Sequence, residues 1–101
     1  MIVTHPISET VLESATATFS CSATINIEWI FSPIRGSDII IEAQMIQIRN
    51  GIVESTLTLS NVNFLQNQGN YTCVVTMDGI NNVTSSASLN ILCKLTFIPY
   101  H

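Results

Sequence analysis

Charge is scarce in this chain. Only 10% of its 101 residues are charged and three are Lys or Arg, whereas an ordinary soluble domain carries about 25% charged residues. The formal net charge of -4 argues against nucleic acid and against an anionic membrane surface as partners. Hydrophobic residues make up 47% and the mean hydropathy is +0.41. We therefore expect glycan or a partner to cover part of the surface, since a bare surface of this kind risks association.

Long apolar runs are missing as well. No stretch approaches the ~20 residues that span a bilayer, so we expect no direct membrane insertion by this fragment. The residues from Met1 to Thr4 lack the basic start and apolar core of a signal peptide. We expect a fragment of a longer secreted chain, with Met1 added as a start for expression.

The sequence also lacks catalytic motifs. It contains no G-x-S-x-G, H-E-x-x-H, C-x-x-C or phosphate-binding loop. His5 and His101 lie at the two ends, and neither has a partner spaced for a metal site or a catalytic triad. The acidic residues are scattered, as solvated surface carboxylates are. We therefore expect no enzyme, no catalytic residues, no metal and no cofactor.

Cysteines are few and odd in number: Cys21, Cys73 and Cys93. If two of them pair, the chain matured in an oxidising compartment and one thiol is left over.

Alternating apolar and polar residues predict β-strands throughout the chain. The segment 15–23 alternates strictly, and 25–31, 52–59 and 71–77 are predicted as further strands with one inward face each, while 87–91 forms the inner face of a last strand. Pro6 to Ser14 suits an edge strand, and Asn50-Gly51 is the strongest hairpin signal. Ile39 to Ile41 is a short run whose facing the period does not assign. Seven or more strands at spacings of about 8–12 residues, without a helical period, predict a single all-β domain.

The run Gly69-Asn70-Tyr71-Thr72-Cys73, together with Cys21 and Trp29, resembles the signature of immunoglobulin-like domains over about residues 6–92. The resemblance implies a two-sheet antiparallel Greek-key sandwich. It implies a Cys21–Cys73 disulfide between the sheets over Trp29, and a tyrosine corner at Tyr71, whose hydroxyl bonds back to the turn backbone. Phe19 and Leu59 belong to the implied core.

Several departures from the family pattern refine this expectation. Ser14 stands where a glycine is usual, and Asn67 replaces the usual Asp of a buried Asp–Arg pair. The short interval from Cys21 to Trp29 favours the compact I-set or C2 type of adhesion molecules and receptors over an antibody variable domain. We expect the domain to occupy residues 1–92 and a connector to a following module or membrane-proximal segment to occupy 93–101. Cys93 is either a buried free thiol or part of a disulfide to another domain or chain.

The resemblance implies an extracellular, non-catalytic protein-recognition module of an adhesion molecule or receptor. Two alternatives stay open: a structural spacer in a multi-domain ectodomain, and a secreted immune effector. The partner is another protein, homophilic or heterophilic, or a neighbouring domain. We predict that a contact face lies on the sheet of strands G, F, C and C′, with Ser88 and Asn90 on its edge strand. It comprises five outward residues: Glu28, Ile30, Thr72, Val74 and Thr76.

Two N-x-[ST] sequons predict glycosylation. Asn82 lies in the expected turn between the last two strands and is the better candidate. Asn70 points outward but lies beside the expected tyrosine corner, which we expect to crowd it.

Overall fold

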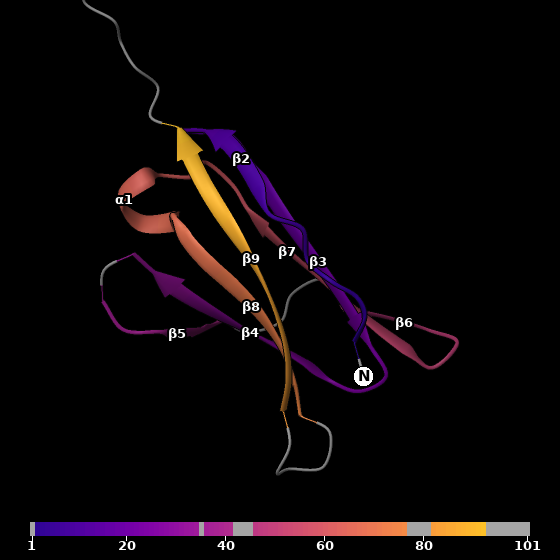
Figure 1. Cartoon of the computed structure of the whole chain (residues 1–101). Coiled ribbons are helices and arrows are strands. Elements are labelled where there is room, and N and C mark those ends of the chain that lie inside the picture. The colour runs from indigo at the N-terminus through magenta and orange to yellow at the C-terminus, as the bar shows by residue number, and fades with distance from the viewer. Residues whose placement is uncertain (1, 35, 42–45, 77–81, 93–101) are drawn as a thin grey trace, which may run out of the picture.

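The computed structural model describes residues 2–34, 36–41, 46–76 and 82–92. Within these residues two sheets pack face to face as an all-β sandwich (Figure 1). The four-stranded sheet has the order β1-β3-β7-β6 and is made of β1 (Ile2–Thr4), β3 (Ala17–Ala23), β7 (Ile52–Leu59) and β6 (Gln47–Arg49). The five-stranded sheet has the order β2-β9-β8-β4-β5 and is made of β2 (Glu9–Leu12), β9 (Asn82–Leu92), β8 (Gly69–Thr76), β4 (Ile27–Pro33) and β5 (Ile39–Ile41).

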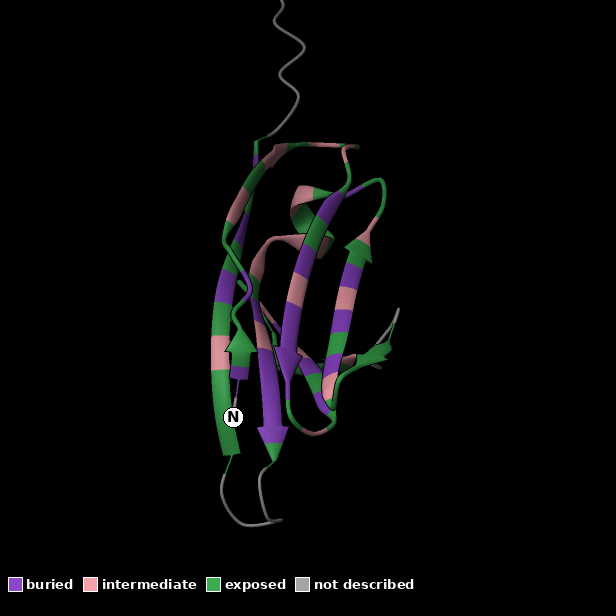
Figure 2. Cartoon of the chain, turned by 90° about the vertical axis from the view of Figure 1, so that its right-hand side faces the viewer, coloured by how far each residue is buried: buried purple, intermediate pink, exposed green. Residues whose placement is uncertain are grey.

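The core follows from the alternation of the sequence, because successive side chains of a strand point to opposite faces of its sheet. Figure 2 shows the resulting alternation of buried and exposed residues along the strands. Both sheets contribute inward residues to one cluster, which includes Phe19, Leu57, Trp29, Tyr71 and Leu89. Leu59 lies partly buried against this cluster. The predicted inner faces are therefore confirmed for the described strands.

The chain crosses between the sheets near its beginning. β1 pairs antiparallel with β3 in one sheet, whereas β2 pairs parallel with β9 in the other. His5 lies in the crossover, and its Nδ1 is 2.7 Å from Oγ of Ser85 on β9. The predicted edge strand in 6–14 is thus confirmed as β2. The expectation that Ser88 and Asn90 lie on an edge strand is wrong, because β2 pairs with β9 and becomes the edge.

The predicted hairpin at Asn50-Gly51 joins β6 to β7. Both residues have positive φ, 54° for Asn50 and 77° for Gly51. A two-residue turn of this kind matches the twist of the strands it connects.

The predicted turn after Val62 contains one helical turn, α1 (Phe64–Asn67). Asn63 caps it, because its Oδ1 accepts from the backbone N–H of Leu65 at 2.8 Å. Asn67 Oδ1 accepts from the Asn63 N–H at 2.7 Å. Glu13 Oε2 accepts from the Phe64 N–H at 3.2 Å. The amide that replaces the family's Asp therefore serves as a local cap on α1, a role that hydrophobic period does not reveal.

Candidate protein-contact face

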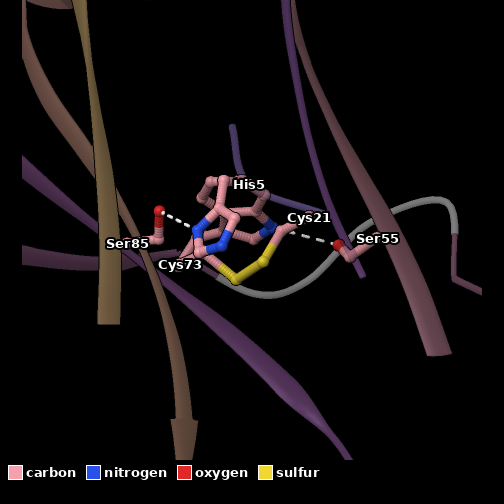
Figure 3. Close-up of a disulfide and its surroundings, with 6 residues drawn as sticks. His5, Cys21, Ser55, Cys73 and Ser85 are labelled. Atoms are coloured by element: carbon pink, nitrogen blue, oxygen red, sulfur yellow. Dashed lines mark hydrogen bonds between the residues drawn. A yellow bond between two sulfur atoms is a disulfide. The ribbon is translucent and has the colours of Figure 1, made fainter. Parts of the chain in front are cut away.

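A disulfide joins the two sheets at the centre of the sandwich. Cys21 on β3 and Cys73 on β8 are bonded, with their Cα atoms 6.4 Å apart, and both residues are fully buried. Figure 3 shows the bond between the layers, near the His5–Ser85 contact. The pairing implied by the family resemblance is confirmed. In the loop-closure model, a bridge between residues 52 positions apart stabilises the fold by about 4 kcal/mol.

Trp29 adds a polar tie between the same sheets. Its indole Nε1 on β4 donates to Oγ of Ser55 on β7 at 3.0 Å, and both residues are 0% exposed. Sequence reasoning missed Ser55. A signal was available, because Ser55 occupies an inward position between Val53 and Leu57 and a buried hydroxyl there needs a partner.

Tyr71 carries the predicted tyrosine corner. Its hydroxyl donates to the backbone carbonyl of Asn67 at 2.6 Å. Its ring lies between Phe19 and Phe31, with centroids 5.0 and 4.6 Å away and interplanar angles of 21° and 19°. Burial raises the pKa of Tyr71 to about 12. These contacts fix β8 and hence the side chains on its outer side.

The strand register brings the predicted contact face together on the outside of the five-stranded sheet. Across β4 and β8, Glu28 lies opposite Val74 and Ile30 lies opposite Thr72. Thr76 follows two residues beyond Val74 on the same side of β8. Glu28 and Thr76 are exposed, and Ile30 and Thr72 are half-buried.

Val74 corrects one part of this prediction. Although it points away from the core, it is only 8% exposed, so it is not the free apolar contact that its position suggested. Its cross-strand neighbours are Glu28 and Thr84, and side chains directly opposite one another in a sheet lie in contact. The alternation of side chains along a strand predicts which side of the sheet a residue faces, but it does not predict how far its cross-strand neighbours cover it.

The structure adds Ile40 to this surface. β5 pairs with β4 so that Ile40 lies opposite Ile30, while Ile39 and Ile41 lie opposite the inward residues Phe31 and Trp29. Ile40 therefore points outward, and it is 74% exposed. β5 is also the last strand of its sheet, next to β4. A run of three isoleucines has no alternation, so only the register could assign its facing.

Both sequon asparagines lie on this same side of the sheet. Asn70 and Asn82 are exposed. Asn82 pairs with Thr76, six residues along β8 from Asn70, so the two occupy opposite ends of the outer surface. At the rise of a strand this corresponds to about 20 Å.

Other predicted features are less informative about chemistry. His5 is exposed, as expected of a terminal residue. Over the residues that the structure describes, no three His, Cys, Asp or Glu side chains gather as metal ligands. No helix in that part of the chain is long and apolar enough to cross a membrane. The expectations for Cys93, His101 and the connector at 93–101 fall outside the described residues.

The comparisons with known proteins identify the family. A family model described as "Immunoglobulin domain" matches residues 1–76. The chain is an immunoglobulin domain. Such domains are in general non-catalytic, and one that carries a disulfide fits an extracellular setting. Among curated protein sequences, none matches this immunoglobulin domain.

Solved structures show the same fold at low sequence identity. The N-terminal Ig1-2 module of the Drosophila Receptor Protein Tyrosine Phosphatase DLAR is 21% identical at a TM-score of 0.71, over 95% of this chain and 50% of that one. This immunoglobulin domain thus spans about half the length of the DLAR module. The RIG-5 IG1 homodimer is 17% identical at a TM-score of 0.66, over 87% and 92% of the two chains. The Titin M10–Obscurin like 1 Ig complex is 16% identical at 0.66, over 95% and 96%.

Proposed function

We propose that this domain is an extracellular, non-catalytic protein-recognition module of a cell-surface adhesion molecule or receptor. The observation that carries the proposal is the pair Ile30 and Ile40. They lie opposite each other on β4 and β5, on the outside of the five-stranded sheet, and Ile40 is 74% exposed. Ile30 belongs to the predicted contact face and Ile40 adjoins it, so a protein that covers them removes apolar area from water, which favours binding.

The chemistry of the surroundings suits a protein partner. Glu28 is exposed on the contact face. Thr72 and Ser86 hold each other through a 2.7 Å hydrogen bond between their hydroxyls, so the hydroxyls near the centre of the face are oriented in advance. A partner with apolar side chains and one basic group near Glu28 matches this surface. Such depletion of charge in the centre is typical of protein interfaces.

The similar structures support protein partners of both kinds. The RIG-5 IG1 structure is a homodimer, and the titin structure is a complex with Obscurin like 1. We infer from them only that this chain binds a protein. The two partners to test are therefore a second copy of the chain and a different protein.

The experiment compares two matched cross-strand pairs. Ile30→Asp with Ile40→Asp places two charges on the outer side of the five-stranded sheet. Thr18→Asp with Thr58→Asp does the same on the outer side of the four-stranded sheet, where the two threonines are likewise paired and both are exposed, whereas Ile30 is half-buried. Light scattering reports self-association, and saturable binding of the labelled domain to intact cells reports a different partner.

We expect the isoleucine variant to lose binding by at least tenfold while its melting temperature stays within a few degrees of that of the threonine variant. Equal binding by both variants contradicts the proposal. Ile30→Asp with Val74→Asp is a poorer choice, because Val74 is nearly buried and its replacement endangers folding.

A structural spacer in a multi-domain ectodomain is the second candidate. It is favoured by the similarity to the DLAR module, which contains two such domains in tandem. In this case the isolated domain binds neither itself nor cells.

A further inference from the structure

A hollow opens beside Asn70 at one end of the outer side of the five-stranded sheet. Its volume is about 410 Å³, and Asn70, Ser32, Ser88, Asn90 and Ile34 are among the residues that line it. Ser32 and Ser88 are the cross-strand neighbours of Asn70 on β4 and β9. Because both neighbours are small, the space around the asparagine stays open.

Gly69 lines the same hollow at a point where β8 lies close to β4. It has no side chain, and a Cβ there would lie 2.9 Å from a ring carbon of Phe31 and still closer to the backbone carbonyl oxygen of Ser32. The close approach of β8 to β4 at this point therefore requires glycine. A side chain at position 69 would meet Phe31 and the backbone of Ser32 and Pro33, and Gly69 itself lines the hollow.

The sequon at Asn70 is laid out favourably by the strand. Asn70 and Thr72 lie on the outer side, whereas the middle residue, Tyr71, points into the core and is 1% exposed. The expectation that the tyrosine corner crowds Asn70 is therefore wrong. The corner forms on the opposite side of β8, and Asn70 itself is exposed.

We propose that Asn70 carries an N-linked glycan and that its first N-acetylglucosamine lies in this hollow. The hydroxyls of Ser32 and Ser88 and the amide of Asn90 offer hydrogen-bond partners to the sugar hydroxyls and the acetamide. Ile34, which is 59% exposed, offers an apolar wall for the acetamide methyl group or for the apolar face of the ring. The inference concerns Asn70 alone and does not rest on the proposed partner binding.

Asn82 provides an internal comparison. Its side chain is also exposed on the same side of the sheet, but it does not line the hollow at Asn70. A glycan at Asn82 is therefore not expected to contact Ser32, Ser88 or Ile34. Asn82 thus serves as a control in which a sugar is attached but does not pack in the hollow.

The test uses the complete chain secreted from a eukaryotic host behind a cleavable signal. Mass spectrometry after enzymatic deglycosylation in heavy-oxygen water measures occupancy at each asparagine, with Asn70→Gln and Asn82→Gln as matched variants. The glycans of the folded protein are then trimmed to a single N-acetylglucosamine. Nuclear Overhauser contacts from the acetamide methyl groups locate each remaining sugar.

We expect Asn70 to be occupied and its acetamide methyl to show contacts with the Ile34 methyl groups. These contacts should disappear in Asn70→Gln and persist in Asn82→Gln. An unmodified Asn70 in the secreted protein overturns the proposal, whatever the state of Asn82. An occupied Asn70 without contacts to the residues of the hollow overturns it as well. If Asn70→Gln does not fold, the comparison between the two trimmed sugars on the parent protein decides the question.

Discussion

The indole of Trp29 and the hydroxyl of Ser55 form a hydrogen bond of 3.0 Å from one sheet of the sandwich to the other. Both residues are 0% exposed, and the Cys21–Cys73 disulfide joins the same two sheets. A covalent and a polar tie therefore hold the layers in one relative position. The outer side of the five-stranded sheet inherits its shape from that position.

Removing the hydroxyl of Ser55 tests the polar tie. In Ser55→Ala the buried indole N–H loses its acceptor, so we expect the free energy of unfolding to fall by about 1–3 kcal/mol. The indole proton should also exchange with solvent faster. Thr56→Ala is the control, because Thr56 is only half-buried and its hydroxyl lies 3.3 Å from that of Ser20. Chemical denaturation measures both, and equal stability of Ser55→Ala and the parent protein contradicts the assignment.

Gly69 should tolerate no side chain. A Cβ at this position would collide with the backbone oxygen of Ser32, and the backbone atoms of a paired strand cannot easily move aside. We expect Gly69→Ala to lower the free energy of unfolding by more than about 2 kcal/mol. Gly51→Ala is the control: its added Cβ meets nothing within 4 Å, although its φ of +77° leaves some strain. Similar losses in the two variants would show that backbone strain alone, and not the close approach, explains the glycine.

Replacing Ser14 by glycine, the residue usual at this position in the family, should stabilise the domain. Its φ is 75°, a conformation that costs an L-residue with a side chain roughly 1–2 kcal/mol. Its N–H nevertheless donates to the Val62 carbonyl at 2.8 Å, which holds it there. We expect Ser14→Gly to raise the free energy of unfolding by about 0.5–1 kcal/mol, and Ser14→Ala to bring no such gain. A loss of stability in Ser14→Gly would sink this account of the turn.

Tyr71 predicts the alkaline behaviour of the domain. Its pKa is about 12 in the folded protein and near 10 when exposed. Between these values the unfolded chain gives up the phenolic proton and the folded chain keeps it. The free energy of unfolding should therefore fall as the pH rises from about 10 towards 12. In Tyr71→Phe this part of the decline should vanish. Denaturation at several pH values between about 10 and 12 measures the free energy of unfolding of both proteins, and an equal decline in the two would contradict the prediction.

The sequence predicted the backbone of the fold well, for physical reasons. Strands buried on one side must alternate, and a G-x-Y-x-C run places Tyr71 and Cys73 on one face of β8. Asn50-Gly51 predicts the hairpin because a two-residue turn of this type needs a positive φ at both positions, and asparagine followed by glycine tolerates this better than most pairs. These signals are short and local, so they can be read from the sequence without knowing which strands pair.

The candidate face was predicted only in outline. The sequence does not assign the facing of Ile40, because three consecutive isoleucines carry no alternation. It predicts an exposed Val74, because the neighbours that cover Val74 come from β4 and β9. The position of β2 beside β9 depends on a parallel pairing between distant segments, which alternation does not encode. Ser55 was missed because a serine in an apolar pattern draws notice only once its partner, Trp29, is located across the sandwich.

The central claim is that the outer side of the five-stranded sheet binds a protein. Carbene footprinting of the glycosylated domain, free and then bound either to its own copy or to the partner found on cells, tests it most directly. We predict that binding reduces labelling of Ile30, Ile40 and Glu28 and leaves that of Thr18 and Thr58 unchanged. Protection of Thr18 and Thr58, with Ile30 and Ile40 labelled as in the free domain, would contradict the claim.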